Sequence, residues 1–251
     1  MKPWPSLLHL DTRLSTPSTS LKTRTPSRTS ISTPKQWFER QIRDPYVKLR
    51  QQSDYRSRAA FKLIEIQKSH KIFKYGMAVL DLGAAPGSWS QVALEYIADN
   101  KPPTSDKPPG RVIGVDLQAI DLLPGATFIQ GDILCPKARD QIKALIPDGQ
   151  HVDVVISDMA CPSMGLKAKE NAVNNELFET ARDTAMMFLK QRGTFVCKFF
   201  QGSFETDQRR ALESVFKKVS LEKPAASRST SSENYFVATG FRTRGNNRQI
   251  S

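Results

Sequence analysis

The sequence predicts an α/β fold, a single domain built on one mostly parallel sheet with helices on both faces. From about residue 57, short apolar and β-branched runs alternate with longer amphipathic stretches, which is the rhythm of successive βαβ units. The chain has 251 residues, of which 39% are apolar and 25% charged, an ordinary globular composition. This length is sufficient for one large core.

Seven short segments, each dense in apolar or β-branched residues, are predicted as strands. In chain order they are Met77–Leu82, Arg111–Asp116, Thr127–Gln130, Val152–Asp158, Thr194–Phe199, Val219–Glu222 and Tyr235–Thr239.

Five longer segments space their apolar residues at helical intervals and are predicted as helices. They are Ser57–Lys68, Ser88–Ala98, Pro136–Ile146, Asn174–Gln191 and Glu205–Phe216. The segment Asp99–Gly110 holds four prolines and two lysines, so we expect a solvated surface insertion there.

Residues 1–34 have a different composition from the rest of the chain. They contain fourteen Ser or Thr, five Pro and a single acid, Asp11, which is too polar and too broken by proline to bury a core. A leader rich in Ser and Arg and poor in acid is typical of a transit peptide, so we expect cleavage and a mitochondrial matrix location. A weakly basic disordered arm is the alternative interpretation.

The charge balance favours a polyanionic partner. Lys and Arg total 37 against 25 acids, giving a net charge of +12, which suits nucleic acid or an anionic membrane surface. No apolar run approaches the roughly 18 residues of a membrane span. Three widely spaced cysteines, Cys135, Cys161 and Cys197, form no CxxC pair, so we expect three buried thiols and neither a metal site nor a disulfide scaffold.

A glycine turn follows the first predicted strand, in the segment Val79–Trp89 with the sequence VLDLGAAPGSW. Open α/β sheets bind ligands at such turns. A GxGxxG dinucleotide loop would need glycine at Ala85, and Pro86 lacks a donor for pyrophosphate, which argues against an NAD-dependent oxidoreductase. No GK[ST] follows, so a Walker A loop is excluded. A cofactor without pyrophosphate, such as S-adenosylmethionine, fits better.

Three aspartates, Asp116, Asp132 and Asp158, close the next three predicted strands. Asp116 lies 33 residues after Gly83, or 21 without the 12-residue proline insertion. That is about the separation at which a carboxylate reaches ribose hydroxyls in mononucleotide-binding halves. Because the carboxyl ends of parallel strands share one edge of the sheet, we expect a ligand site there.

Five motifs follow one another along the chain: RSRAAFKL at Arg56–Leu63, DLGAAPGSW at Asp81–Trp89, SDMA at Ser157–Ala160, FVCKFFQG at Phe195–Gly202 and SENYFVATG at Ser232–Gly240. In these motifs the chain resembles the FtsJ-type ribosomal RNA 2′-O-methyltransferases. The resemblance extends over about residues 36–241 and leaves residues 242–251 as a polar C-terminal tail.

The resemblance implies a Rossmann-like, seven-stranded methyltransferase domain that uses S-adenosyl-L-methionine. It also implies a catalytic tetrad of Lys62, Asp158, Lys198 and Glu233. The implied cofactor contacts are Pro86, Gly87, Ser88, Trp89, Asp116, Asp132, Ile133 and Asp158. Ser88 stands where bacterial members commonly have glycine, and Cys161 is inserted before Pro162.

The chemistry of ribose methylation suits these residue types. A 2′-hydroxyl is a poor nucleophile, whereas a sulfonium methyl is already a strong electrophile, so the enzyme supplies alignment and a proton acceptor. Lys198, in an apolar strand near a second cation, can become partly neutral and act as the base. Asp158 and Glu233 would orient it, and Lys62 would stabilise charge developing on the oxygen.

A basic run precedes Lys62, and we expect it to contact RNA phosphates beside the reaction. A solvated charged face is the alternative. The run consists of Arg40, Arg43, Lys48, Arg50, Arg56 and Arg58, with Tyr46 and Tyr55 interleaved.

The sequence therefore predicts a monomeric, S-adenosylmethionine-dependent RNA ribose 2′-O-methyltransferase. Its expected partner is ribosomal RNA or an assembling large ribosomal subunit. The resemblance implies a uridine in the A-loop of large-subunit RNA, and the leader implies the mitochondrial version, in ribosome biogenesis. A transfer RNA 2′-O-methyltransferase and a non-catalytic RNA-binding assembly factor stay open as alternatives, although a binder has no need of Lys198 and Glu233.

Overall fold

The computed structural model describes residues 53–242 apart from 100, 148–149 and 229–230. Within this part of the chain, seven strands form one sheet in the order β3-β2-β1-β4-β5-β7-β6. The strands are β1 (Ala78–Leu82), β2 (Arg111–Asp116), β3 (Ala126–Gln130), β4 (Val152–Ser157), β5 (Leu189–Phe200), β6 (Phe216–Glu222) and β7 (Glu233–Phe241). The helices are α3 (Ala59–His70), α4 (Ser88–Leu94), the π-helical η1 (Glu95–Asp99), α5 (Pro136–Leu145), α6 (Lys167–Phe188) and α7 (Glu205–Glu213).

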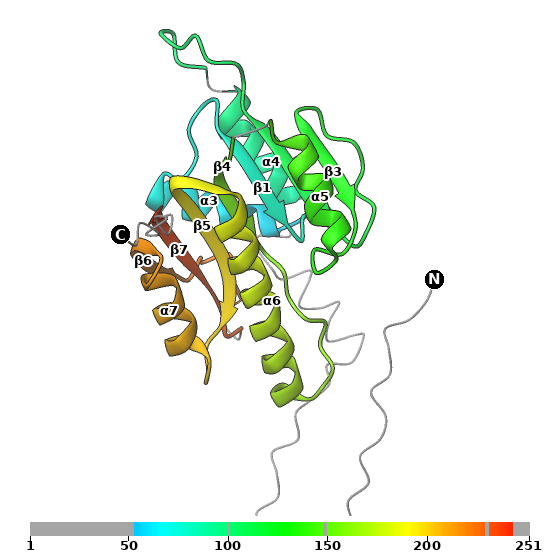
Figure 1. Ribbon diagram of the computed structural model, residues 1–251. Helices are drawn as coiled ribbons and strands as arrows, with labels where there is room; N and C mark the ends of the chain where they lie inside the picture. Colours follow the sequence, from blue (N-terminus) through cyan, green and yellow to red (C-terminus); the bar gives the residue numbers. More distant parts are fainter. Residues whose placement is uncertain (1–52, 100, 148–149, 229–230, 243–251) are drawn as a thin grey trace, which may run out of the picture.

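Helices cover both faces of the sheet (Figure 1). One apolar cluster lies under α5, α6 and α7, and the other lies under α3 and α4. Successive strand residues point to opposite faces, so Phe195 belongs to the first cluster and Val196 to the second. Both side chains are fully buried. The predicted fold class, a mostly parallel α/β sheet covered on both faces, is confirmed.

The direction of β7 determines which residues meet at the edge of the sheet. Strands β1 to β5 are parallel where they pair, whereas β7 runs antiparallel to β5 and β6. The start of β7 therefore lies beside the end of β5, with Glu233 opposite Phe200 and Tyr235 opposite Lys198. Residues from β7 thus reach the edge where the parallel strands end.

The predicted helix at Asn174–Gln191 is wrong at both ends. Helix α6 begins seven residues earlier, at Lys167, because strong helix formers continue the helix without apolar periodicity. Glu170 secures this start by accepting the backbone N–H groups of Met164 and Gly165. At the other end, Leu189 pairs with Val152 in the sheet and so starts β5.

Two other predicted helices are shorter than expected. The segment Ser88–Ala98 is α-helical only to Leu94 and continues as η1. Helix α7 ends at Glu213 rather than Phe216, because Val215 and Phe216 turn into the core and Phe216 begins β6. The predicted insertion is confirmed where it is described, since residues 101–109 are mainly exposed and have no regular structure.

The cysteine prediction holds only in part. Cys197 is buried, but Cys135 is exposed and Cys161 is partly exposed. Both lie in loops after strands rather than inside them: Cys135 precedes Pro136 at the start of α5, and Cys161 follows β4. The two cysteines are more exposed than Cys197 because loops run along the surface of the protein.

Parts of the predicted organisation lie outside the described residues. These are the leader at 1–34, the beginning of the predicted domain at 36 and the tail at 242–251 beyond Arg242. None of the helices in the described ranges is both long and apolar enough to cross a membrane.

Candidate active site

The glycine loop after β1 is held mainly by backbone hydrogen bonds. Gly83 and Ala84 donate their N–H groups to Val115 O, at 2.9 and 3.1 Å. Ala85 N donates to Asp116 Oδ2 at 2.9 Å. Gly83 has a φ of 73°, and a Cβ there would collide with Met159, so only glycine lets the loop approach the chain that follows Asp158.

A guanidinium group clamps this loop from outside. Arg56 donates to Pro86 O at 3.1 Å, to Asp121 O at 3.0 Å and to Leu122 O at 2.8 Å. It lies against Gly87, whose φ is 104° and whose added Cβ would come within 2.6 Å of Arg56 Nη1. Arg56 therefore ties the loop after β1 to the loop after β2.

This clamp gives the described part of the basic run a structural role that the sequence did not predict, and its contact with RNA phosphates stays a prediction. Arg56 binds protein carbonyls, Arg58 donates to Ala226 O at 2.6 Å, and Tyr55 donates to Glu95 at 2.7 Å. These side chains are used to hold the fold together, which a run of charges in sequence does not reveal. The other members of the run, Arg40, Arg43, Tyr46, Lys48 and Arg50, lie outside the described residues.

The predicted cofactor acids lie at the carboxyl edge, as expected. Both carboxylate oxygens of Asp116 accept backbone N–H groups, from Ala85 and from Gln118 at 2.8 Å. Asp132 Oδ1 accepts from Leu134 N at 2.9 Å, and Ile133 is 7% exposed. A carboxylate has about four acceptor positions, so both acids keep capacity for ribose hydroxyls.

The side chains of two other predicted cofactor contacts, Ser88 and Trp89, point into the protein. Ser88 Oγ shares a hydrogen bond with Ser57 Oγ at 2.7 Å, and Trp89 Nε1 donates to Ala59 O at 2.9 Å. The Trp89 ring packs 5.6 Å from that of Tyr235. Both side chains are buried beneath the loop. Contact of Pro86, Gly87, Ser88 and Trp89 with the cofactor stays a prediction.

The structure brings the four predicted catalytic residues together as two ion pairs. Lys62 Nζ lies 2.7 Å from Glu233 Oε1, and Lys198 Nζ lies 2.7 Å from Asp158 Oδ1. Lys198 also donates to Asp158 O at 2.8 Å. The lysine side chains are only 10% and 8% exposed. Buried pairs of this kind need complete hydrogen bonding, which makes their geometry specific.

Tyr235 joins the two pairs, although sequence reasoning did not select it as a site residue. Its hydroxyl donates to Asp158 Oδ1 at 2.6 Å, and its ring lies 5.9 Å from Lys62 Nζ. Burial, then the charges of Asp158 and Glu233, raise the pKa of Tyr235 well above its usual value, so its proton stays in place. Its place in the SENYFVATG motif was the available signal.

The Asp158 carboxylate is kept ionised by its partners. Burial alone would raise its pKa, but the charges of Lys198 and Lys62 and the hydrogen bonds from Lys198 and Tyr235 outweigh burial and lower the pKa. The site therefore holds a permanent negative charge beside the two amines.

Asp81 is a second site residue that the sequence reasoning missed. It is 1% exposed, lies in β1 under the glycine loop and accepts a hydrogen bond from Ser90 Oγ at 2.7 Å. Burial raises its pKa to about 7, and the charges of Asp158 and Asp116 add to this effect. An acid within an otherwise apolar buried strand was the signal that could have identified it.

These acids decide which cofactor the edge suits. Asp116 and Asp132 form no ion pair among the described residues, so the edge around the glycine loop favours a cationic ligand and disfavours a pyrophosphate. The backbone donors of Gly83, Ala84 and Ala85 are already used by Val115 and Asp116. The fold and the site together define the class of S-adenosylmethionine-dependent methyltransferases, whose cofactor carries a sulfonium cation.

Comparison with known proteins identifies the family. The profile of the FtsJ-like methyltransferases matches residues 55–241, so the chain belongs to that family and uses S-adenosyl-L-methionine. A similar protein is the "Ribosomal RNA large subunit methyltransferase E" of Paramagnetospirillum magneticum, 43% identical over 89% of this chain and 88% of its own length. Another of the same name, from Marinobacter nauticus, is 42% identical over 82% of this chain and 95% of its own length.

A solved structure extends the comparison to the fold. It is described as a ribosomal RNA methyltransferase from Plasmodium falciparum and superposes with a TM-score of 0.64 at 30% identity. The match covers 74% of this chain and 98% of the other. The expected enzyme class, a methyltransferase dependent on S-adenosylmethionine, is confirmed.

Proposed function

We propose that this enzyme methylates a ribose 2′-hydroxyl of large-subunit ribosomal RNA. The observation that carries the proposal is the coupled set of ion pairs, Lys198 with Asp158 and Lys62 with Glu233, beside the cofactor loop. A hydroxyl needs a proton acceptor and charge stabilisation, which two buried amines supply. The relatives named as large-subunit RNA methyltransferases, 41 to 44% identical, support the choice of RNA.

In this proposal, different residues of the chain bind the cofactor and accept the proton. Asp116 and Asp132 would hold the cofactor's ribose, and the glycine loop would receive its methionine part. S-adenosylmethionine supplies an electrophilic methyl on a positively charged sulfur. Lys198 Nζ would accept the proton that the 2′-hydroxyl releases as its oxygen takes the methyl group.

The partners of the two lysines complete the mechanism. Asp158 Oδ1, 2.7 Å from Lys198 Nζ, stabilises the ammonium that forms. Lys62, oriented by Glu233 at 2.7 Å, stabilises negative charge on the attacking oxygen. All these groups come from one chain, and we propose a monomer as the active unit.

The finer proposal concerns target and place. We propose a uridine in the A-loop of mitochondrial large-subunit ribosomal RNA, methylated in the matrix during ribosome assembly. The leader at 1–34, with five basic residues and one acid, supports import. The resemblance to large-subunit RNA methyltransferases supports the target.

The decisive experiment maps ribose methylation in ribosomal RNA from cells with and without this protein. Purified enzyme should also label large ribosomal subunits better than deproteinised RNA. Labelling should fall steeply as salt rises, because phosphate contacts release counterions. Labelling of transfer RNA with none in large-subunit RNA would overturn the target, and no labelling of either would favour a binding role.

Mass spectrometry of the natural protein tests the location. We expect the mature chain to begin near Thr33 to Trp37 and to fractionate with mitochondria. An intact Met1 in cytosolic or nuclear fractions would favour the disordered-arm interpretation and a cytoplasmic RNA target.

A further inference from the structure

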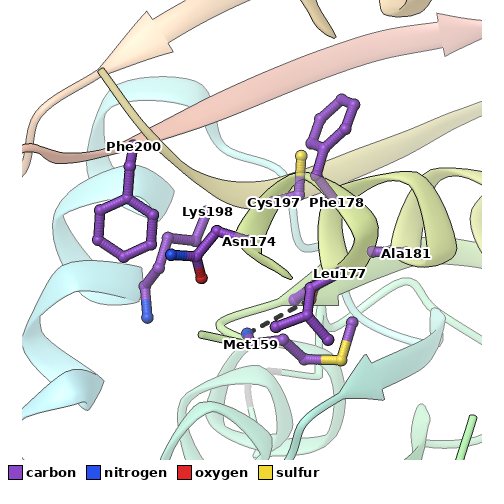
Figure 2. Close-up of a pocket in the computed structure, with 9 residues that line it drawn as sticks. Met159, Asn174, Leu177, Phe178, Ala181, Cys197, Lys198 and Phe200 are labelled. Atoms are coloured by element: carbon purple, nitrogen blue, oxygen red, sulfur yellow. Dashed lines mark hydrogen bonds between the residues drawn. The ribbon is translucent and has the colours of Figure 1, made fainter. Parts of the chain in front are cut away.

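Two cavities lie between α6 and the end of β5 with the segment that follows it, and the first of them is beside Lys198. The first is lined by Lys198, Asn174, Phe200 and apolar residues of α6 (Figure 2). The second is lined by polar amides and aromatic rings, chiefly Asn171, Asn174, Asn175, Phe200, Phe204 and Gln208. Asn174 and Phe200 line both cavities, so the two lie side by side, and together we call them the cleft. Each has a volume of about 10 Å³, room for roughly one water, so a larger ligand would lie at the mouth of the cleft.

The amide of Asn174 has a fixed orientation. Its Oδ1 accepts the backbone N–H of Cys161 at 2.8 Å, which leaves Nδ2 as the group available to the cleft. Figure 2 shows this nitrogen directed toward Phe200 and Lys198. Among the described residues, no acceptor bonds to Nδ2. Asn174 therefore presents a hydrogen-bond donor beside the proposed base.

Gln208 presents the complementary group at the back of the cleft. It is 7% exposed, and its Nε2 donates to Asn175 Oδ1 at 2.9 Å. Its Oε1 is enclosed and accepts no hydrogen bond from any residue in the described ranges. Buried acceptors are normally satisfied, so an unpaired one that lines a cavity indicates a missing donor.

The aromatic residues of the cleft suit a planar ligand. Phe200 lies two residues beyond Lys198 on β5, about 7 Å along the strand and on the same face. Phe200 is partly buried, and Phe204 is 37% exposed. Proteins that bind unpaired RNA stack its bases on such rings and read the base edges with amide side chains.

We propose that this cleft recognises the nucleobase of the nucleotide that is methylated. With the 2′-hydroxyl at Lys198, the attached base stacks on Phe200 at the mouth of the cleft, and Asn174 Nδ2 donates to O4 of uracil or to O6 of guanine. Gln208 Oε1 accepts a hydrogen bond from a water in the second cavity, about 10 Å³, which has room for roughly one, and that water accepts the imino N–H of the base. The donor at this position selects uracil or guanine, which carry a carbonyl oxygen there, over cytosine, which carries an amino group. The inference rests on the proposed function, because it needs RNA at Lys198.

The test compares base preference. Substrates are unmethylated large subunits that carry either uridine or cytidine at the methylated position. Wild type should favour uridine at least tenfold in kcat/KM. Asn174→Asp keeps the acceptor for Cys161 but removes the donor, so the preference should fall about tenfold. Any general effect of the new charge on Lys198 cancels in the ratio.

Controls separate this role from folding and from the proposed function. Glu176→Ala, an exposed substitution on the same helix, should leave the preference unchanged. Calorimetry measures the affinity of each variant for S-adenosylmethionine and so shows whether the variant is folded. If Asn174→Asp does not bind the cofactor, Phe200→Leu and Asn174→Ala are used for the comparison instead. An unchanged uridine preference in all folded cleft variants would overturn the inference. If the enzyme labels transfer RNA instead, the proposed target fails, while the same comparison at the transfer RNA position still decides the role of the cleft.

Discussion

The two halves of the sheet edge are held by different kinds of interaction. In the cofactor half, around β1 and β2, backbone N–H groups of the glycine loop bond to Val115 O and to the Asp116 carboxylate. In the catalytic half, around β4, β5 and β7, side chains bond to side chains, as in the pair of Lys198 with Asp158. The cofactor half is held by backbone hydrogen bonds, and the catalytic half by buried ion pairs.

This difference predicts how each half responds to mutation. Removing a side chain from the cofactor half leaves a loop whose other backbone bonds persist, so the loss is confined to ligand affinity. Removing one partner of a buried ion pair leaves the other charge uncompensated. Substitutions in the catalytic half should therefore change the reaction itself, and substitutions in the cofactor half should change binding.

The largest effect is expected at Lys198. Lys198→Ala should reduce methyl transfer by about 10² to 10⁴-fold, the usual contribution of a positioned base. Affinity for S-adenosylmethionine should stay within a few fold, because the amine does not hold the cofactor. Incorporation of labelled methyl groups into large subunits and calorimetry with the cofactor measure the two quantities.

A lysine on the same strand provides the control. Lys190 is half-exposed at the start of β5 and pairs with Asp153, far along the strand from the glycine loop. Lys190→Ala should leave methyl transfer near the wild-type rate. Near-normal turnover by Lys198→Ala would show that Lys198 is not the base. It would also contradict the expected difference between the catalytic and cofactor halves.

The cofactor half should respond in the opposite way at Asp116. Asp116→Ala removes charge-assisted hydrogen bonds worth about 1.5 to 3 kcal/mol, so cofactor affinity should fall about ten- to a hundredfold. The rate at saturating cofactor should change little. Titration calorimetry checks the affinity, with Asp140→Ala, an exposed acid on α5, as the control. Unchanged affinity would exclude Asp116 from the cofactor site.

The same contrast explains what the sequence could predict. The cofactor half was accessible because its parts are local: DLGAAPGSW is contiguous, and β2 was predicted with its observed bounds. The ion pairs could not be predicted from the sequence, because Lys62 and Glu233 are 171 residues apart and only the reversed direction of β7 brings them together. The resemblance supplied the four residues, but not which lysine pairs with which acid.

Other misses have the same physical origin. The three carbonyl partners of Arg56 were not predicted, because a charge in the sequence does not show which groups the fold brings to it. Asp81 and Tyr235 lie within the motifs, but the sequence did not reveal their roles, because burial next to other charges arises only in the folded protein.

Tyr235→Phe should sharpen the comparison with a smaller effect. The variant loses one hydrogen bond to Asp158 Oδ1, while Lys198 still holds that carboxylate. We expect about a fivefold lower kcat, equivalent to about 1 kcal/mol, and little change in cofactor affinity. Because Tyr235 helps to lower the pKa of Asp158, the acid limb of the kcat profile should move to higher pH.

The matched control for that variant is Tyr96→Phe, in η1 on the face covered by α4. It should leave both kcat and its pH profile as in the wild type. A profile for Tyr235→Phe that coincides with the wild type would show that the tyrosine supports packing alone.

Asp81 lies where the two halves meet, and it should give the smallest effect. Its pKa in the fold is about 7, against about 3.9 in the unfolded chain. Between these values the folded state binds more protons than the unfolded state, so the free energy of unfolding falls as pH rises. The loss begins above about pH 4 and is complete above about pH 7.

Asp81→Asn removes this titration while keeping an acceptor for Ser90 Oγ. The melting temperature of the variant relative to wild type should therefore rise between pH 5 and pH 8, by about 2 to 4 °C for each kcal/mol of lost charge burial. Calorimetric scans across that pH range measure the difference in melting temperature between variant and wild type. For the control Asp140→Asn, exposed on α5, this difference should not change with pH. A flat difference for Asp81→Asn as well would mean that the carboxylate is already ionised under the loop. The cofactor and catalytic halves would then not share a titrating group.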